Sequence, residues 1–331
     1  MIVTLTMNPA LDRTVDLAAA LVPGEVQPAL SEREDPGGKG VNVARVIAGA
    51  GTAVTAVLPL SAQDPYRALL GDLPVRTVAV EGRARANLTL TDRDGVTTKV
   101  NLPGPVLGDA EIRALIDAVV EAADGATWLA LCGSLPRGVA SDFYVAVARA
   151  VRSRAVRPPR IAVDTSGPAL EEVVAAGAVD LIKPNDIELA ELVAGFALRE
   201  GEVTTDAADA LAERLQGELA ADPTSARDIA RALVPARVGA ALITLGGDGA
   251  VLVDAEGAWF GRTPPTRVRS TVGAGDSALA GFLLAHAAGE GAEGRLRSAI
   301  RYGSATASLP GTRLAAPGDL TTHDVLIHSL A

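Results

Sequence analysis

The stretch RIAVDTSGPALEEVVAAGAVDLIKPN, residues 160–185, shows how this chain is built. Its two ends, RIAVD and VDLIKPN, are short apolar runs of the kind found in buried strands, and the residues after Gly167 have a helical pattern. Two successive strands joined through a helix pair in parallel, with a right-handed crossover. The stretch therefore predicts a strand–helix–strand unit of an α/β protein.

The same alternation continues in both directions along the chain. Further strand-like runs lie at 2–7, 53–60, 127–133 and 239–247, and helical patterns at 39–50, at 109–123, from Ser141, after Gly275 and after Arg295. This order predicts a doubly wound, mostly parallel sheet with helices on both faces. Since no repeat or flexible linker interrupts it, residues 1–331 are expected to form a single domain.

Composition narrows the class of protein further. Hydrophobic residues make up 48% of the chain and aromatic residues only 3%, which suits buried parallel strands covered by small-residue helices. The net charge of −10 argues against nucleic acid or an anionic membrane as the main partner. No apolar run approaches the roughly 18 residues of a membrane span. A single cysteine, Cys132, excludes an internal disulfide and fits a reducing compartment, so we expect a cytoplasmic protein.

Two regions depart from the alternation of strands and helices. RANLTLTDRDGVTTKVN, residues 85–101, predicts a hairpin that turns at Asp94 and Gly95, and 12–17 and 26–34 are two more extended pieces. Together they form either a surface hairpin with neighbours or a small β-sheet lid over the mouth of the main sheet. The other region, 195–237, is polar and alanine-rich, and we interpret it as a surface elaboration without chemistry.

Glycine-rich turns precede two of the helices. DPGGKGVNVARVIAGAG (35–51) sets glycines and Lys39 before a helix, and STVGAGDSALAGF (270–282) sets glycines directly before Asp276. Helix starts present unpaired N–H groups that bind anions, and glycine lets a phosphate approach them. A carboxylate beside a bound anion is unfavourable unless it has a task, such as taking a proton from an attacking hydroxyl. The alternative is an acidic first-turn residue that only stabilises the helix.

Three further motifs follow predicted strands, where ligands bind in parallel sheets. GSLPRGV (133–139) is a loop with Ser134 and Arg137. KPNDIEL (183–189) places Asn185 three residues before Glu188, which indicates either a capping box or a pair that orders hydrated Mg²⁺. ITLGGDGA (243–250) is a glycine turn that fits either a nucleotide site or a plain hairpin.

In this order the motifs GGKGVNVAR (37–45), GSLPRGV, KPNDIEL, ITLGGDGA and STVGAGDSALAGF resemble those of the ribokinase-like (PfkB) family of sugar kinases. The resemblance covers essentially the whole chain. TMNPALDRTVDL (6–17) is similar to the hexose-phosphate kinase branch, typified by 1-phosphofructokinase and tagatose-6-phosphate kinase. The resemblance implies a ribokinase-like fold with a β lid, ATP and Mg²⁺ as cofactors, a small phosphosugar as substrate, and a homodimer formed through the lid.

The resemblance also implies roles for individual residues. Asp276 would be the catalytic base, and Gly273, Ala274 and Gly275 would form the anion hole. The substrate-binding residues would be Asp12, Gly37, Gly38, Lys39, Asn42, Arg85, Lys99, Asn101, Ser134 and Arg137. The ATP-binding residues would be Lys183, Asn185, Thr244, Gly246, Gly249, Thr271 and Ser308. Asn185 and Glu188 would hold the metal through water.

The implied reaction is ATP-dependent phosphorylation of fructose 1-phosphate to fructose 1,6-bisphosphate. Thr89 stands where many 1-phosphofructokinases have lysine, Arg137 is a charge that could replace it, and Gly311–Leu314 is similar to the minor 6-phosphofructokinase. Fructose 6-phosphate and tagatose 6-phosphate therefore remain alternatives. A non-catalytic sugar- or nucleotide-binding regulator is a further alternative, against which the intact Asp276 motif argues. A dinucleotide-dependent dehydrogenase is set aside, because Gly-x-Gly-x-x-Gly is missing after the first strand.

Overall fold

The strand–helix–strand unit at 160–185 is present and belongs to a large sheet. It consists of β9 (Arg160–Asp164), α5 (Pro168–Ala176) and β10 (Leu181–Ile182), and β10 pairs in parallel with β9. Helix α5 begins at Pro168, where the missing N–H costs nothing, and ends before Gly177 in the left-handed conformation.

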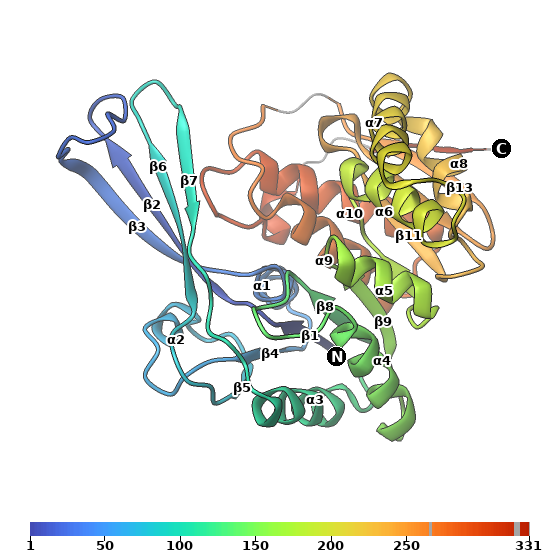
Figure 1. Cartoon of the computed structure of the whole chain (residues 1–331), viewed down its shortest axis with the longest axis horizontal. Helices are drawn as coiled ribbons and strands as arrows, with labels where there is room; N and C mark the ends of the chain where they lie inside the picture. The colour runs from blue at the N-terminus through green and yellow to red at the C-terminus, as the bar shows by residue number, and fades with distance from the viewer. Residues whose placement is uncertain (265–266, 321–324, 331) are drawn as a thin grey trace.

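The computed structural model describes residues 1–264, 267–320 and 325–330 and contains two separate sheets (Figure 1). The large sheet has the order β14-β13-β12-β11-β10-β9-β8-β1-β4-β5. Its other strands are β1 (Ile2–Thr6), β4 (Val54–Pro59), β5 (Val75–Val78), β8 (Trp128–Cys132), β11 (Ala240–Thr244), β12 (Ala250–Asp254), β13 (Ala258–Arg262) and β14 (Leu326–Ser329). Strands β5 to β11 along this order are parallel, and β12, β13 and β14 extend the edge in antiparallel fashion. The predicted fold class is thus confirmed.

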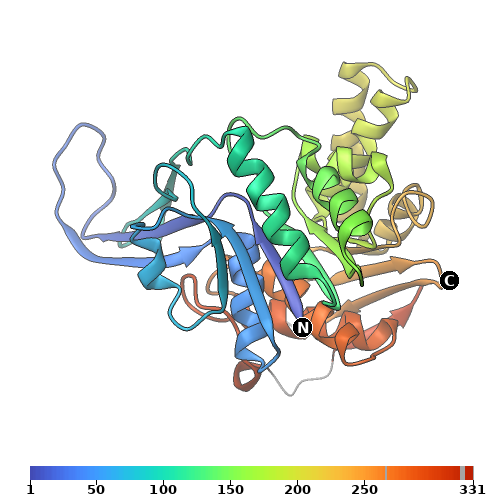
Figure 2. The same cartoon turned by 90° about the horizontal axis from the view of Figure 1, so that it is seen from below.

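Helices cover both faces of this sheet (Figure 2). One face carries α1 (Lys39–Gly49), α2 (Tyr66–Leu69), α9 (Ala274–Ala287) and α10 (Ala292–Ala307). The other carries α3 (Asp109–Ala123), α4 (Phe143–Arg154), α5, α6 (Asp186–Arg199), α7 (Thr205–Ala221) and α8 (Ala226–Arg231). Short 3₁₀ turns lie at η1 (Pro223–Ser225), η2 (Gly246–Asp248) and η3 (Pro317–Asp319).

Strand residues alternate between two hydrophobic cores, one on each face. In β8, Leu129 and Leu131 enter the core under α3 and α4, and Trp128, Ala130 and Cys132 enter the core under α9 and α10. Because both faces are buried, the strands read as continuous apolar runs. Cys132 is fully buried and packs, as its apolar surroundings indicated.

The region 195–237 contributes more to the core than the sequence suggested. It contains the end of α6 and all of α7 and α8, and Phe196, Leu215, Leu219 and Ile229 are buried against the sheet side of the chain. The prediction of a surface elaboration was therefore wrong in part. Helix α7 is mostly polar, yet it buries a narrow apolar stripe that includes Leu215 and Leu219. No described helix combines the length and hydropathy needed to cross a bilayer.

The second sheet projects from the body on the left of Figure 1, and we call it the lid. Its order is β3 (Ala29–Gly37), β2 (Ala10–Leu17), β6 (Arg85–Thr91) and β7 (Thr97–Asn101). Strands β2 and β6 pair in parallel, and each pairs with its hairpin partner in antiparallel fashion. The β2–β3 hairpin lies between β1 and α1 in the chain, and the β6–β7 hairpin lies between β5 and α3.

Candidate active site

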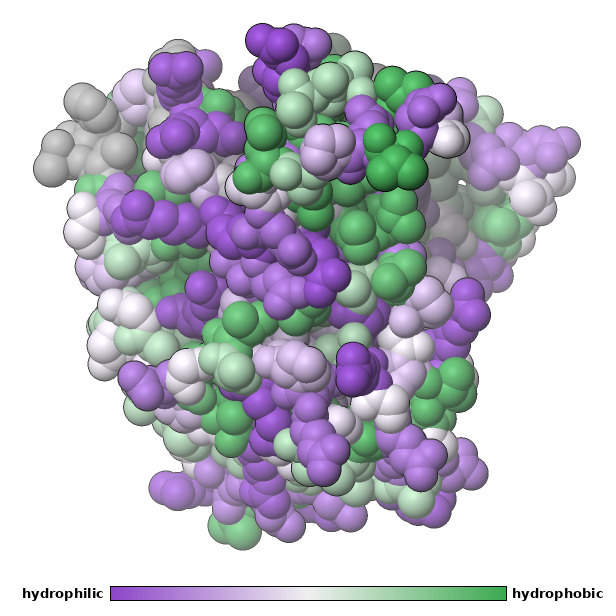
Figure 3. Space-filling view, turned by 90° about the vertical axis from the view of Figure 1, so that its left-hand side faces the viewer, coloured by the Kyte–Doolittle hydropathy of each residue, from purple (hydrophilic) through white to green (hydrophobic). Residues whose placement is uncertain are grey.

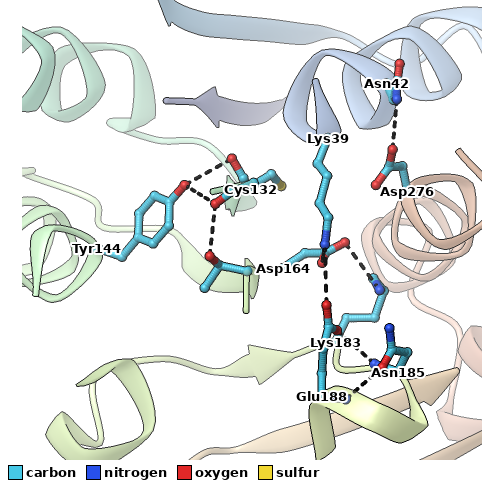
Figure 4. Close-up of polar contacts among 11 residues, drawn as sticks. Lys39, Asn42, Cys132, Tyr144, Asp164, Lys183, Asn185, Glu188 and Asp276 are labelled. Carbon is cyan, nitrogen blue, oxygen red and sulfur yellow. Dashed lines mark hydrogen bonds and ion pairs between the residues drawn. The ribbon is translucent and has the colours of Figure 1, made fainter. Parts of the chain in front are cut away.

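Four charged side chains meet where parallel strands of the large sheet end and two helices begin (Figure 4). Asp164 ends β9, Lys183 follows β10, Lys39 is the first residue of α1, and Asp276 lies in the first turn of α9. Parallel strands end at the same edge of the sheet, so these four residues, which are far apart in the sequence, are brought together there.

Asp276 is a buried carboxylate with one well-defined partner. Its side chain is 7% exposed, and the Asn42 amide of α1 donates a hydrogen bond of 2.8 Å to its Oδ2. Burial, and then the charge of Asp164, raise the pKa of Asp276 to about 6, although the Asn42 hydrogen bond and two lysines act in the opposite direction. A carboxyl group with this pKa is a suitable proton acceptor near neutral pH.

The turn before Asp276 has the conformation that an anion site needs. Gly273 caps α9 with φ of 77°, and a Cβ at this position would press on Leu314 at 2.6 Å. Glycine is therefore required both for the backbone angle and for space. The N–H of Ala274 donates to the Thr271 carbonyl at 3.3 Å, a weak hydrogen bond for a turn.

Asp164 is fully buried between two lysines. Lys39 Nζ lies 2.7 Å from its Oδ1, and Lys183 Nζ lies 3.3 Å from its Oδ2. Burial alone would raise the pKa of Asp164, but Lys183 and Lys39 outweigh it and lower the pKa. Burial would likewise lower the pKa of Lys39, and the charges of Asp164 and Glu188 raise it instead. Asp164 and Lys39 therefore both stay charged.

Asn185 and Glu188 form the capping box that was one of the two interpretations of their spacing. Asn185 Oδ1 accepts from the Glu188 N–H at 2.7 Å, and Glu188 Oε2 accepts from the Asn185 N–H at 3.0 Å. The other carboxylate oxygen of Glu188 lies 3.9 Å from Lys39 Nζ. Capping therefore leaves one Glu188 oxygen facing the charged cluster.

The loop after β8 lies beneath Lys39. The Gly133 carbonyl accepts hydrogen bonds from Tyr144 Oη at 2.8 Å and Thr165 Oγ1 at 2.9 Å. A Cβ at Gly133 would lie 3.9 Å from Lys39 Cβ. Ser134 is exposed and accepts a long hydrogen bond of 3.4 Å from the Asn8 amide, and Arg137 is exposed further along the loop.

The inner face of the lid carries the residues predicted to bind substrate. Asp12 of β2 accepts a hydrogen bond of 2.8 Å from Asn87 of β6, and a Cβ at Gly37 of β3 would overlap the Asp12 carboxylate. Burial raises the pKa of Asp12, and the Asn87 hydrogen bond and then the charge of Arg85 partly offset that effect. Gly38 has φ of 120°, and a Cβ at this position would lie 2.8 Å from Thr6 Cγ2.

Two cations share this face with Asp12. Arg85 is half-buried, burial lowers the pKa of its guanidinium, and its Nε has no hydrogen-bond partner among the described residues. Lys99 and Asn101 of β7 are exposed and lie opposite Thr89 and Asn87 in the register of β6. Buried donors are rarely without a hydrogen-bond partner, so the Arg85 guanidinium is a candidate for contact with a ligand oxygen.

The residues predicted to bind ATP form two groups. Thr244 ends β11 and bridges to Asn185, and Gly246 and Gly249 follow in a turn with φ of 57° and 109°. Thr271 follows Ser270, whose N–H donates to the Ala307 carbonyl beside Ser308. The structure thus brings Asn185 to Thr244, and Thr271 to the end of α10.

Sequence reasoning missed several residues of this site. Asp164 ends an apolar strand, and that position was its only signal. Asn87 is hidden in the alternation of the hairpin. Tyr66, whose buried hydroxyl donates to the Gly37 carbonyl at 2.6 Å, has no sequence signal.

Comparison with known proteins supports one family over most of the chain. Residues 5–318 match the pfkB family carbohydrate kinase family. The chain is 36% identical to a 1-phosphofructokinase of Rhodobacter capsulatus, covering 92% of this chain and 90% of the relative. It is 32% identical to the ATP-dependent 6-phosphofructokinase isozyme 2 of Escherichia coli, covering 96% of each. The crystal structure of phosphofructokinase-2 from Escherichia coli in complex with fructose-6-phosphate superimposes with a TM-score of 0.78 at 30% identity, covering 96% of each chain.

Proposed function

Because the chain belongs to the pfkB family of carbohydrate kinases, we propose that it transfers a phosphoryl group from ATP to a hexose phosphate. The preferred acceptor is fructose 1-phosphate, and the product is fructose 1,6-bisphosphate. The observation that carries this proposal is the buried Asp276 carboxylate, which Asn42 holds at the glycine-rich start of a helix. The similarity to a protein named 1-phosphofructokinase favours this sugar phosphate among the hexose phosphates.

Asp276 is the general base of the proposed reaction. Its carboxylate accepts the proton of the C6 hydroxyl of fructose 1-phosphate while that oxygen attacks the γ-phosphorus, and ADP leaves with the electrons of the broken P–O bond. Asn42 fixes the carboxylate by donating to Oδ2, which leaves Oδ1 for the hydroxyl. A pKa of about 6 keeps most of the carboxyl groups ionised at neutral pH.

The turn at Gly273, Ala274 and Gly275 stabilises the transferring phosphoryl group. Its N–H groups and the start of α9 point partial positive charge toward the oxygens on which negative charge develops. The weak donation from Ala274 to Thr271 must be shared or given up when a phosphoryl oxygen binds. Lys183 lies beside this turn, since a Cβ at Gly275 would be 3.3 Å from its Nζ.

The donor set also fits Mg²⁺, which usually keeps several waters and takes few protein oxygens. The Oδ2 atom of Asp164 is buried with the Lys183 ammonium 3.3 Å away, and one Glu188 oxygen lies 3.9 Å from Lys39 Nζ. No three His, Cys, Asp or Glu side chains are grouped as a metal site in the described part of the chain. Most ligands of a bound Mg²⁺ would therefore be phosphate and water oxygens. Glu188, ordered by Asn185, would hold the ion. Bound Mg²⁺ would neutralise charge on the ATP phosphates.

The lid recognises the phosphate that the acceptor already carries. Arg85 presents a buried, unpartnered Nε on the same face as Asp12, and Lys99 and Asn101 lie across the hairpin. In a chain of net charge −10, these cations make a local anion site. Asp12, Gly37, Gly38, Lys39 and Asn42 then surround the sugar hydroxyls between the lid and Asp276.

A second acceptor, fructose 6-phosphate, has a specific observation in its favour. The relative named 6-phosphofructokinase is similar over 96% of the chain, and Gly311–Leu314 is similar to that enzyme class. Either acceptor offers one phosphate to the lid and one primary hydroxyl to Asp276, and both give the same bisphosphate. Tagatose 6-phosphate is the third candidate.

The test is an ADP-release assay with ATP and Mg²⁺ over fructose 1-phosphate, fructose 6-phosphate, tagatose 6-phosphate and free fructose. The highest kcat/KM is expected for fructose 1-phosphate. Asp276→Asn should lower kcat for every acceptor by about 10²–10⁴-fold, the usual contribution of a general base. A chain that binds these sugars without releasing ADP would instead be a regulator. A preference for fructose 6-phosphate would move the assignment to the second acceptor.

We also propose that two copies associate through the outer faces of their lids. Leu11, Val15, Leu88, Leu90 and Val100 share the face opposite Asp12, and Val100 is 48% exposed. Figure 3 views this side of the molecule and shows hydrophobic residues gathered beside a hydrophilic band. Stacking two such faces would remove this patch from water. Sedimentation should show a dimer that Val100→Glu dissociates; a monomeric wild type would refute it.

The location proposed for the chain is the cytoplasm. ATP and sugar phosphates are cytoplasmic metabolites, and the described chain has a single, buried, unpaired cysteine, Cys132. Fractionation of cells that express the tagged chain would test this.

A further inference from the structure

The segment after α10 contacts the lid and the active-site turn at the same time. We call residues 311–315 the strut. At one end, Thr312 Oγ1 lies between two residues of lid strand β3. It accepts a hydrogen bond of 3.0 Å from Arg33 Nη2 and donates one of 2.5 Å to Asp35 Oδ2. Arg33 Nε closes the group with a 2.7 Å contact to the same Asp35 oxygen. Hydrogen bonds with charged partners are the strong kind.

Gly311 makes this end of the strut possible. Its φ of +64° is a left-handed conformation that glycine adopts without strain. A Cβ at this position would also overlap the guanidinium of Arg33. The backbone angle favours glycine, and a larger residue would displace the Arg33 guanidinium from its place beside the strut.

The other end of the strut is fixed at the start of α9. Leu314 packs on Gly273, the cap of that helix. The Ala315 N–H donates to Thr306 Oγ1 at 3.0 Å, and Thr306 in turn donates to Ser277 Oγ at 2.7 Å. Ala315, Thr306 and Ser277 are all buried. Ser277 is the residue after Asp276, so these hydrogen bonds connect the strut to the backbone that carries the base.

Between its ends the strut spans the two halves of the proposed substrate site. Asp35 lies opposite Asp12 in the register of β3 and β2, and its charge contributes to the raised pKa of Asp12 after burial. Phosphoryl transfer requires the acceptor hydroxyl and the phosphorus to be aligned closely, and an error of about 1 Å costs about 100-fold in rate. The acceptor is held by the lid, and the phosphoryl group by the turn at Gly273.

We propose that the strut sets the position of the lid relative to the anion-hole turn, and that Thr312 is the positioning residue that joins them. This inference rests on the proposed kinase function for its kinetic consequences. In this proposal Thr312 acts through Asp35 on the lid and through its neighbour Leu314 on Gly273. Losing its hydroxyl removes the side-chain hydrogen bonds between the strut and Arg33 and Asp35, so the lid is held less firmly against the anion-hole turn.

The kinetic test compares Thr312→Val, Thr312→Ser and a matched control, Thr224→Val. Thr224 also donates to a carboxylate, that of Asp222 at 2.7 Å, but lies between α7 and α8. Thr312→Val should lower kcat/KM for the phosphosugar by about 10-fold or more, through both terms, and change KM for ATP by less than about 2-fold. Thr312→Ser should restore most of the loss, and Thr224→Val should behave as wild type.

A second readout does not depend on catalysis. Amide hydrogen exchange of the ligand-free protein should quicken in both β3 and residues 271–275 of Thr312→Val, and in neither segment of Thr224→Val. The proposal would be overturned if Thr312→Val changed neither the kinetic parameters nor the amide hydrogen exchange. Faster exchange in β3 alone, without a change in residues 271–275, would also overturn it. If wild type phosphorylates no sugar phosphate, the proposed function fails, and the exchange measurement alone still decides the role of the strut.

Discussion

Replacing Asp276 with Asn should remove a stability penalty that the folded chain carries at neutral pH, although the variant loses its base. Burial, and then the charge of Asp164, raise the pKa of Asp276 from 3.8 to about 6. Because the folded-state pKa lies above the unfolded-state value, the folded chain binds this proton more tightly. The free energy of unfolding therefore falls as pH rises through this window, and the full penalty is present at higher pH.

The size of the effect follows from the two pKa values. Their difference, at about 1.36 kcal/mol per pKa unit, corresponds to about 3 kcal/mol. The asparagine variant carries no charge to desolvate, so its stability relative to wild type should rise by about this amount between about pH 4 and pH 7. A changed hydrogen bond with Asn42 adds an offset that does not vary with pH over this range.

Denaturant unfolding of both proteins across this pH range measures the difference. Asp222→Asn is a control of opposite sign: hydrogen bonds from Thr224 lower the pKa of Asp222, so its charge stabilises the fold at neutral pH. That contribution is lost as pH falls through the folded-state pKa. The acid limb of kcat/KM for wild type should have its midpoint near the same pH of about 6. A stability difference between Asp276→Asn and wild type that is constant with pH would refute this reasoning.

Four further substitutions test other parts of the site. Arg85→Ala should raise KM for the phosphosugar by about 10–100-fold and leave KM for ATP nearly unchanged, because a charge-assisted contact is lost. Arg93→Ala, in the exposed hairpin turn, is the control. Efficient turnover of free fructose by wild type would contradict the assignment. Glu188→Gln should raise the Mg²⁺ concentration needed for half-maximal rate. Asn185→Ala should lower the free energy of unfolding by about 0.5–2 kcal/mol, because the helix cap is lost. If neither variant changes the Mg²⁺ requirement, the pair has only a structural role. Gly37→Ala should raise KM for the sugar by about 10-fold or more, because the new methyl group displaces Asp12. Gly49→Ala is the control, because no other atom lies close to Gly49. Equal sugar KM values in the two variants would show that Asp12 does not need this space.

Local patterns in the sequence were sufficient for most elements. The helix predicted at 109–123 has those bounds, because acidic residues start it and its apolar spacing is regular. The lid hairpin at 85–101 is equally local. Strands β5, β13 and β14 were not foreseen, since each has only four or five residues and lies at or near a sheet edge, where half-exposed residues weaken the apolar signal.

The site was less predictable than the fold because its contacts join distant parts of the chain. Asn42 was expected at the sugar, yet its amide bonds Asp276, 234 residues away. Asp164 is recognisable as a site residue only through its ion pair with Lys39, 125 residues earlier in the chain. No periodicity reports such pairs. The glycine motifs were visible because they are themselves local: the backbone angles and space that they provide depend on residues close in sequence.

The lid is assembled from two hairpins that leave the body at different points of the chain. A two-stranded hairpin alone is marginally stable in water, so each hairpin depends on the β2–β6 pairing to fold. The two insertions also divide the proposed recognition tasks: Asp12 belongs to the first, and Arg85 and Lys99 belong to the second. Selection can therefore alter the phosphate-binding insertion while the hydroxyl-binding insertion and the catalytic body stay intact. A chimaera with the 85–101 hairpin of a relative would reproduce this route to a new acceptor in one step.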